Sequence, residues 1–238
     1  MIDRDLAAAA ALQRMLLPPA PLSVAGWEAV HTFEPAGAVS GDYVDLVPHE
    51  DGLYFMLGDV AGKGIAASML MAQLHAMFRS LVPFRLPLAD LIARASALLC
   101  ASSLPAQYAT LVCGYLDPTG LADICNAGHP PPLTITGDGH ATVRPTGVPI
   151  GMFCESRFTS TRLALSPGDT LLTYTDGLSE ARNPRGEEYG AERIEAVAAR
   201  HGSEPLQALV DACLSSQAAF REGLPNTDDL TTLAIRRL

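Results

Sequence analysis

Four segments of the chain place aspartate where a predicted strand begins or ends, and there side chains from different strands can meet. Each aspartate alone is typical of a turn or of a helix N-cap. Together their oxygens are the ligands that hard divalent cations prefer. The segments are residues 40–45 (Ser-Gly-Asp-Tyr-Val-Asp), 58–64 (Gly-Asp-Val-Ala-Gly-Lys-Gly), 175–177 (Thr-Asp-Gly) and 226–229 (Asn-Thr-Asp-Asp).

The first two segments are predicted to meet in a hairpin. Residues 42–47 alternate apolar and polar side chains, residues 53–57 are an apolar run, and Asp51-Gly52 between them is a turn signal. Counting outward from a two-residue turn there places Asp59 opposite Val44, with Asp42 as its diagonal neighbour roughly 7–8 Å away. Two carboxylates beside an apolar strand raise each other's pKa unless a cation lies between them. Because no His/Cys cluster accompanies them, we predict a hard divalent cation rather than zinc.

The second segment is also rich in glycine. Three glycines in seven residues permit close backbone approach, and the helix predicted to follow offers its N-terminal N–H groups to an anion. A nucleotide-binding loop is the competing interpretation. It is disfavoured because Gly, not Ser or Thr, follows Lys63, and because Leu57 stands where that loop needs its first glycine.

The elements that must position these residues are clustered strands and two blocks of helices. Such an order predicts mainly antiparallel sheets covered by helices, an α+β layered sandwich in one domain. An amphipathic helix is predicted at residues 3–17, ended by Pro18-Pro19. Strands are predicted at 27–33, 42–47, 53–57, at 108–116, 121–125, 132–136 and 141–143 as a meander, at 158–165 and 170–174 as a pair, and at 230–236; helices are predicted at 62–81, 88–103, 191–200 and 205–220.

Composition excludes several classes of protein. The 238 residues are 48% apolar and carry a formal net charge of −10, which opposes binding to nucleic acid or to anionic lipid. No apolar run reaches the roughly 20 residues that span a bilayer, and the acidic N-terminus does not resemble a signal peptide. Five cysteines without CxxC spacing predict small buried apolar side chains in a reducing, cytoplasmic compartment, not disulfides.

Five motifs occur along the chain in a fixed order. They are Ser-Gly-Asp42-Tyr-Val-Asp45, Gly-Asp59-Val-Ala-Gly-Lys-Gly, Asn126-Ala-Gly-His129-Pro-Pro-Pro-Leu, Tyr174-Thr-Asp176-Gly-Leu-Ser-Glu180-Ala and Asp228-Asp229-Leu-Thr231. In this order they resemble the SpoIIE/RsbU-like branch of the metal-dependent PPM serine/threonine phosphatases. The resemblance implies a four-layer αββα sandwich, two Mn²⁺ or Mg²⁺ ions and, as substrate, a phosphorylated STAS-domain anti-sigma-factor antagonist. Residues 12–19 also resemble the helix that precedes such a catalytic domain.

The same resemblance implies a role for each matching residue. Asp59 would bridge the two metals and the Val60 carbonyl would bind one of them. Asp42 would serve the second metal directly or through water. Asp176 and Asp228 would complete the first metal site, with Asp229 as the alternative to Asp228. Metal-activated water would then attack phosphorus in line, without a covalent enzyme intermediate.

Other positions depart from the family pattern or leave alternatives open. Ala61 stands where eukaryotic-type relatives carry a histidine, and no phosphate-holding arginine is identified, so the general acid is unassigned. Lys63 is either a phosphate contact or a solvated lysine at a helix start, and His129 either shapes a turn or takes part in catalysis.

The expected organisation is an N-terminal helix for regulation or dimerisation at residues 1–19 and a catalytic domain at residues 20–238. No nucleic acid or membrane is expected among its partners. A catalytically silent phosphatase fold that acts as a sensor or adaptor is the alternative function. A third candidate is an unrelated metallohydrolase of small phosphate esters.

Overall fold

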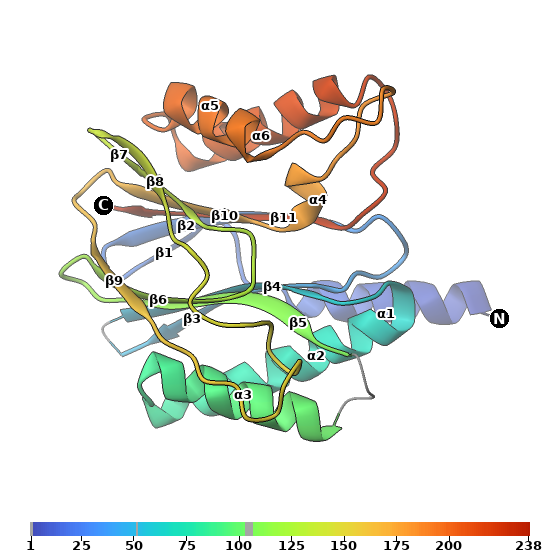
Figure 1. Cartoon of the computed structure of the whole chain (residues 1–238), viewed down its shortest axis with the longest axis vertical. Coiled ribbons are helices and arrows are strands. Elements are labelled where there is room, and N and C mark those ends of the chain that lie inside the picture. Colours follow the sequence, from blue (N-terminus) through green and yellow to red (C-terminus); the bar gives the residue numbers. More distant parts are fainter. Residues whose placement is uncertain (1, 51, 103–106) are drawn as a thin grey trace.

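The computed structural model describes residues 2–50, 52–102 and 107–238, and in it four layers are stacked as helices, sheet, sheet and helices (Figure 1). The predicted four-layer α+β sandwich is therefore confirmed. Both sheets are antiparallel throughout their paired strands. This arrangement buries one face of each sheet against the other sheet and the opposite face under helices.

The first sheet has six strands, and the last strand of the chain lies in its middle. Strand β11 pairs with β2 on one side and with β10 on the other, so residues near both ends of the chain meet here. In spatial order the strands are β1 (Leu22–Val24), β2 (Trp27–Glu34), β11 (Leu230–Arg237), β10 (Thr170–Tyr174), β7 (Leu133–Thr136) and β8 (Gly139–Thr142).

The second sheet has five strands and contains the predicted hairpin. Strands β3, β4, β5 and β6 follow one another as a meander, and β9 closes the far edge. In spatial order they are β3 (Asp42–His49), β4 (Gly52–Val60), β5 (Ala109–Leu116), β6 (Leu121–Ala127) and β9 (Thr161–Ala164).

Two groups of helices cover the outer faces. Helices α2 and α3 lie on the five-stranded sheet, while α5 and α6 lie on the six-stranded sheet with the short α4 beside β11 (Figure 1). The helices are α1 (Ile2–Leu16), α2 (Gly64–Leu81), the 3-10 turn η1 (Val82–Phe84), α3 (Leu88–Ser102), α4 (Asp176–Ser179), α5 (Ala191–His201) and α6 (Leu206–Phe220).

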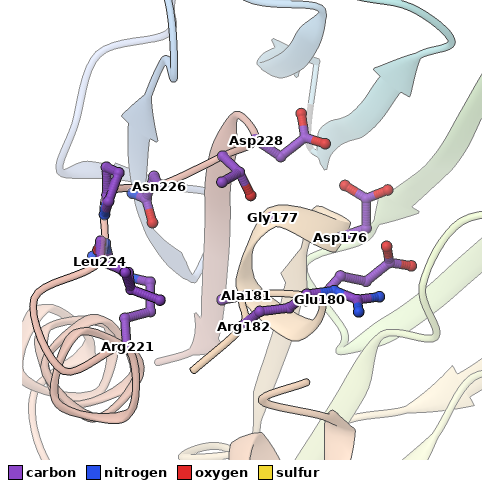
Figure 2. Close-up of a pocket in the computed structure, with 11 residues that line it drawn as sticks. Asp176, Gly177, Glu180, Ala181, Arg182, Arg221, Leu224, Asn226 and Asp228 are labelled. Carbon is purple, nitrogen blue, oxygen red and sulfur yellow. The ribbon is translucent and has the colours of Figure 1, made fainter. Parts of the chain in front are cut away.

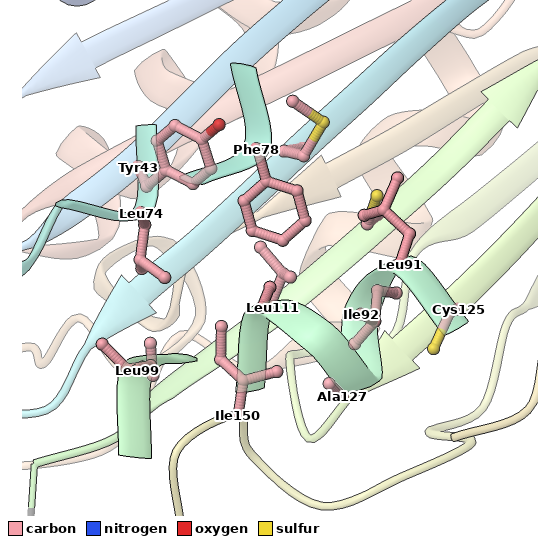
Figure 3. Close-up of a cluster of buried hydrophobic side chains, with 14 of the residues drawn as sticks. Tyr43, Leu74, Phe78, Leu91, Ile92, Leu99, Leu111, Cys125, Ala127 and Ile150 are labelled. Atoms are coloured by element: carbon pink, nitrogen blue, oxygen red, sulfur yellow. The ribbon is translucent and has the colours of Figure 1, made fainter. Parts of the chain in front are cut away.

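The core is divided into three apolar clusters by the layers. One lies between the sheets around Trp27 and Phe55, and one lies under α5 and α6. The third fills the space under α2 and α3, where Phe78 and Tyr43 stack with their ring centroids 6.0 Å apart (Figure 3). Helix α2 with its following turn, Gly64–Phe84, has the length and composition of a membrane span, but its buried side chains belong to this third cluster.

Two predicted strand pairings are wrong. The strand predicted at 158–165 does not pair with β10, because its ordered part, β9, pairs with β6 in the other sheet. The predicted meander at 108–143 also divides, since β7 and β8 join the six-stranded sheet. Local apolar patterns predicted these strands but did not distinguish between two sheets that share one core.

The prediction that the cysteines form no disulfides is wrong for one pair. Cys113, Cys125 and Cys213 are buried and free, as predicted. Cys100 and Cys154 instead form a disulfide, with their Cα atoms 5.5 Å apart. They are 54 residues apart in sequence, so only the fold, which carries the segment after β8 back to the end of α3, brings them within bridging distance.

Candidate functional site

The site begins with the hairpin of β3 and β4, where Asp42 lies directly opposite Asp59. The predicted register placed Val44 opposite Asp59 and is wrong by two residues on one strand. The pairing of His49 with Gly52 leaves Glu50 and residue 51 as the connection, and Glu50 takes a left-handed conformation with φ of 49°. Asp51, part of the predicted turn, lies outside the described residues. Since the shift is even, both aspartates still share one face.

Asp42 is buried between the sheets and is held there by hydroxyl groups of the six-stranded sheet. Its Oδ2 accepts hydrogen bonds from Thr231 Oγ1 at 2.5 Å and from Thr175 Oγ1 at 3.0 Å. Burial, and then the charge of Asp59, raise the pKa of Asp42 well above its usual range, although the two hydroxyls act in the opposite direction. A buried carboxylate with no cation at hand is costly, and such a group is typical of a functional site.

Asp59 and Asp176 are brought together with Asp228 from three separate strand ends. Burial, followed by the charges of Asp176 and Asp228, raises the pKa of Asp59 to about 7. Burial, followed by the charge of Asp228, raises the pKa of Asp176 to about 6. Burial is the larger cause of both pKa shifts, and the added repulsion shows that the three carboxylates lie near one another at one end of the sandwich.

The convergence is not a closed cage. Among the described residues, no group of three or more His, Cys, Asp or Glu side chains already encloses a point at which an ion could sit. The carboxylates are near enough to interact electrostatically but do not share a centre.

Gly177 allows the Asp176 loop to approach the start of β11 closely. A Cβ atom at Gly177 would overlap the carbonyl oxygen of Asp229, so no other residue fits there without a backbone shift. The loop is tied in place by Thr175 N, which donates to Thr231 O at 2.9 Å. The Thr-Asp-Gly and Asp-Asp segments are separated by 50 residues of chain. They can pack together because Gly177 has no side chain at the point of contact.

The two adjacent aspartates at the start of β11 have different surroundings. Both oxygens of Asp229 accept backbone hydrogen bonds, Oδ1 from Ala36 N at 2.8 Å and Oδ2 from Gly41 N at 2.9 Å. Asp228 Oδ2 instead pairs with Lys63 Nζ at 2.9 Å, and both side chains are largely exposed. Asp229 thus fastens the loop that leads into Asp42, while Asp228 faces the solvent side of the site.

The glycine-rich segment forms the turn between β4 and α2. Gly62 and Gly64 have φ of 110° and 72°, so glycine is required there by backbone conformation, and a Cβ at either position would meet open space rather than a neighbour. Val60 is buried, and its N–H donates to Gly41 O at 3.3 Å. Lys63 precedes the helix and contacts Asp228 and the Thr227 carbonyl.

His129 lies in the interior, not among the carboxylates. Its ring Nδ1 is 2.9 Å from Thr110 Oγ1, and its backbone N–H donates to Asn126 Oδ1 at 2.8 Å. Burial lowers the pKa of His129 to about 3, so the ring is neutral at physiological pH. These contacts favour the turn-shaping interpretation over a catalytic one.

Some residues that position the site were assigned no role by sequence reasoning. Thr175 and Thr231 hold Asp42, and both lie inside the motifs that supply the predicted aspartate ligands. Gln13 of α1 clamps the loop before Asp42: its Nε2 donates to Ser40 O at 2.7 Å, and its Oε1 accepts from Ser40 N at 2.9 Å. Gln13 lies in the segment 12–19 that resembles the helix before such a catalytic domain, but the sequence assigned it no individual role.

Two antiparallel sheets between helix layers, with aspartates gathered at one end of the sandwich, define a protein of the PP2C-type phosphatase fold. Residues 49–238 match the model of the family described as stage II sporulation protein E (SpoIIE). The chain belongs to the SpoIIE family.

Individual relatives agree with this assignment. The chain is 27% identical to phosphoserine phosphatase RsbP of Bacillus subtilis, covering 83% of this chain and 49% of RsbP. It is 28% identical to protein IcfG of Synechocystis sp. (strain ATCC 27184 / PCC 6803 / Kazusa), covering 95% of this chain and 40% of IcfG. It therefore spans half or less of these relatives' length. The solved SiaA-PP2C domain of Pseudomonas aeruginosa shares the fold, with a TM-score of 0.87, 22% identity, and coverage of 99% of this chain and 96% of that domain.

Proposed function

We propose that this protein is a metal-dependent phosphatase that hydrolyses phosphoserine or phosphothreonine in a phosphorylated STAS-domain protein. One observation carries the proposal: Asp59, Asp176 and Asp228 come from three strand ends and lie close enough that, after burial, the charges of Asp176 and Asp228 raise the pKa of Asp59. Membership of the SpoIIE family and similarity to phosphoserine phosphatase RsbP support the reaction class. The STAS-domain substrate rests on the family resemblance.

The donor set fits two hard divalent cations, Mn²⁺ or Mg²⁺. Carboxylate and carbonyl oxygens are the ligands these ions prefer, and a cation between repelling carboxylates would reverse the pKa shifts. We propose that Asp59 bridges the pair, that the Val60 carbonyl contributes, and that Asp176 and Asp228 complete one side. When bound, such a pair supplies an activated water and neutralises phosphate charge.

The remaining acidic residues have supporting roles in this proposal. Because both oxygens of Asp229 are occupied by backbone N–H groups, Asp228 is the better metal ligand of the two. The hydroxyls of Thr175 and Thr231 occupy Oδ2 of Asp42, so Oδ1 is the oxygen that serves the second metal, directly or through water. Lys63 neutralises Asp228 until a cation binds and is then free to contact phosphate.

A silent sensor or adaptor is the second candidate, and it is favoured by the lack of a closed ligand cage among the described residues. Thermal unfolding of the whole chain with and without Mn²⁺, together with hydrolysis of a phosphoserine protein, separates the two. A metal at 100 times its dissociation constant adds about 2.7 kcal/mol, which is a rise of roughly 5–10 °C for a chain of this size.

Each outcome of this experiment has a meaning. A thermal shift with metal-restored phosphate release supports the enzyme, and a shift without turnover supports the silent module. No thermal shift at millimolar Mn²⁺ would contradict metal binding, both in the enzyme and in the silent module. Hydrolysis of small phosphate esters with no activity on any phosphoprotein would favour the third candidate, a small-ester metallohydrolase.

The organisation around this activity is also proposed. Helix α1 packs Leu16 against the core and connects to the Asp42 loop through Gln13, which suits a regulatory element or a dimer contact at residues 1–19 before a catalytic domain at 20–238. Leu12 and Met15 on the same helix are exposed at 64% and 79%, so an apolar surface is available to a regulator or a second copy. A cytoplasmic location and the lack of nucleic-acid or membrane partners remain predictions.

A further inference from the structure

A pocket of about 420 Å³ is lined in part by the candidate metal ligands, and the charge of its lining differs from one side to the other. Asp176, Asp228 and Glu180 lie on one side and Arg221 lies on the other, with the end of Arg182 beside Glu180 (Figure 2). The start of α4, the segment after it and the residues that follow α6 from Arg221 to Asp228 form the walls. Phosphate held near the aspartates would therefore have two guanidinium groups within the same cavity.

Arg221 is held by the buried side chain of Gln217, which also contacts the segments that carry Asp176 and Asp228. Gln217, 1% exposed, accepts a hydrogen bond from Arg221 Nε through its Oε1 at 2.9 Å. The Nε2 of Gln217 donates to Gly177 O at 3.2 Å and contacts Asn226 Oδ1 at 3.4 Å. One side chain thus links Arg221 to the residue after Asp176 and to the segment before Asp228.

The charge of Arg221 is not neutralised by a neighbouring acid. Its Nη1 donates to the Leu224 carbonyl, and the ion pairs formed among the described residues do not include Arg221. Arg182 is different, because it already pairs with Glu188 at 2.5 Å. A fixed guanidinium without a carboxylate partner, in a pocket of a protein with net charge −10, is suited to an acidic ligand.

We propose that this pocket receives the polypeptide flanking the phosphorylated residue and that Arg221 selects an Asp or Glu side chain near the phosphoserine. The inference rests on the proposed phosphatase function and names its substrate class as an acidic phosphopeptide segment. Arg182 is already paired with Glu188, so Arg221 supplies the unpaired positive charge, and the exposed Leu224 gives the peptide an apolar wall. Elsewhere, the net negative charge of the protein opposes an acidic substrate, so selection depends on this local arginine.

The test uses the whole chain with Mn²⁺ and a set of phosphoserine peptides that differ at one position. In each peptide a single Asp occupies one position within four residues of the phosphoserine, on either side, and the position differs from peptide to peptide. Matched peptides carry Asn or Lys at the same position. We expect kcat/KM to favour Asp over Asn about five- to tenfold at one or two positions. Arg221→Gln should abolish that ratio, and Arg221→Glu should reverse it in favour of Lys.

Arg185→Gln is the matched control, since Arg185 is an exposed arginine on the segment after α4 that does not line the pocket. It should keep the Asp preference of the unchanged protein. Hydrolysis of the Asn peptides by the unchanged protein tests the proposed function separately, because these phosphoserine substrates carry no acidic flank. If the Asn peptides are hydrolysed but the Asp preference is missing, or survives in Arg221→Gln and Arg221→Glu, the inference is wrong. If no phosphoserine peptide is hydrolysed, the proposed function fails and the inference fails with it.

Discussion

Strand β3 carries two fully buried aspartates, Asp42 and Asp45, whose hydrogen-bond partners differ in charge. Asp45 faces helix α2, where Arg79 holds both its oxygens, with Nη2 2.6 Å from Oδ1 and Nε 2.8 Å from Oδ2. Asp42 faces the space between the sheets, where two threonine hydroxyls and another aspartate surround it. Three positions separate them, so they point to opposite faces of one strand.

The difference shows how a structural carboxylate is distinguished from a functional one. Asp45 receives a permanent cation from its own chain, and the nearby His75 ring, whose pKa is lowered chiefly by burial, remains neutral beside it. Asp42 receives only hydroxyl groups, and its partner Asp59 adds repulsion. A chain can stabilise a buried aspartate with arginine, and where it does not, a ligand is expected to supply the charge.

Breaking the functional side gives the largest expected effect. Asp59→Asn should reduce metal-dependent phosphate release to below about one thousandth, since the bridging carboxylate and its charge are lost together. The same variant should unfold about 2–8 °C higher without metal, because it removes a buried charge and its repulsion, together worth roughly 1–2 kcal/mol. Activity within tenfold of the unchanged protein would contradict the bridging role.

The stabilising effect of Asp59→Asn should depend on pH. The folded protein holds a proton on Asp59 up to a pKa of about 7, whereas the carboxyl's ordinary pKa is 3.8. Between these values the folded state binds more protons than the unfolded state, so the metal-free protein loses stability as pH rises from about 4 to about 7. In Asp59→Asn this part of the slope should be missing, and identical slopes in both proteins would refute the assignment.

Breaking the structural side should affect stability without affecting metal binding. Arg79→Met keeps the apolar stem but leaves Asp45 buried and unpaired, which should lower the free energy of unfolding by about 3 kcal/mol. Denaturant unfolding measures this loss, and the double variant Asp45→Asn/Arg79→Met should recover much of it. The stabilisation that Mn²⁺ gives should be the same in all three proteins. A loss of metal binding in Arg79→Met would show that the two sides of β3 are not independent.

The smallest effect sharpens the comparison by testing how Asp42 is held. Gln13→Ala removes both hydrogen bonds to the Ser40 backbone, and Ser40 Oγ in turn accepts from Asp42 N at 2.9 Å. We expect a loss of about 1–2 kcal/mol in stability and a two- to tenfold weaker apparent Mn²⁺ affinity by thermal shift. Arg14→Ala, an exposed neighbour on α1, should change neither. Equal metal affinity in both variants would leave Gln13 a purely structural contact.

The sequence by itself determined the elements and the chemical types at the site. Apolar periodicity predicted the long helices and most strands because each buries one face against a core, and the aspartates at strand ends predicted an oxygen-rich cation site. The motif order predicted the family and the four layers. These properties depend on short stretches of chain, each of which carries its own signal.

Only the tertiary structure decided which segments meet and how their charges are balanced. The direct Asp42–Asp59 pairing accompanies a left-handed Glu50, β9 pairs with β6 in the other sheet, and the Cys100–Cys154 contact spans 54 residues. The pairing of Asp45 with Arg79 and the isolation of Asp42 likewise depend on which face each side chain meets. The physical reason is that register and charge compensation are set by packing between distant segments, and local pattern does not determine that packing.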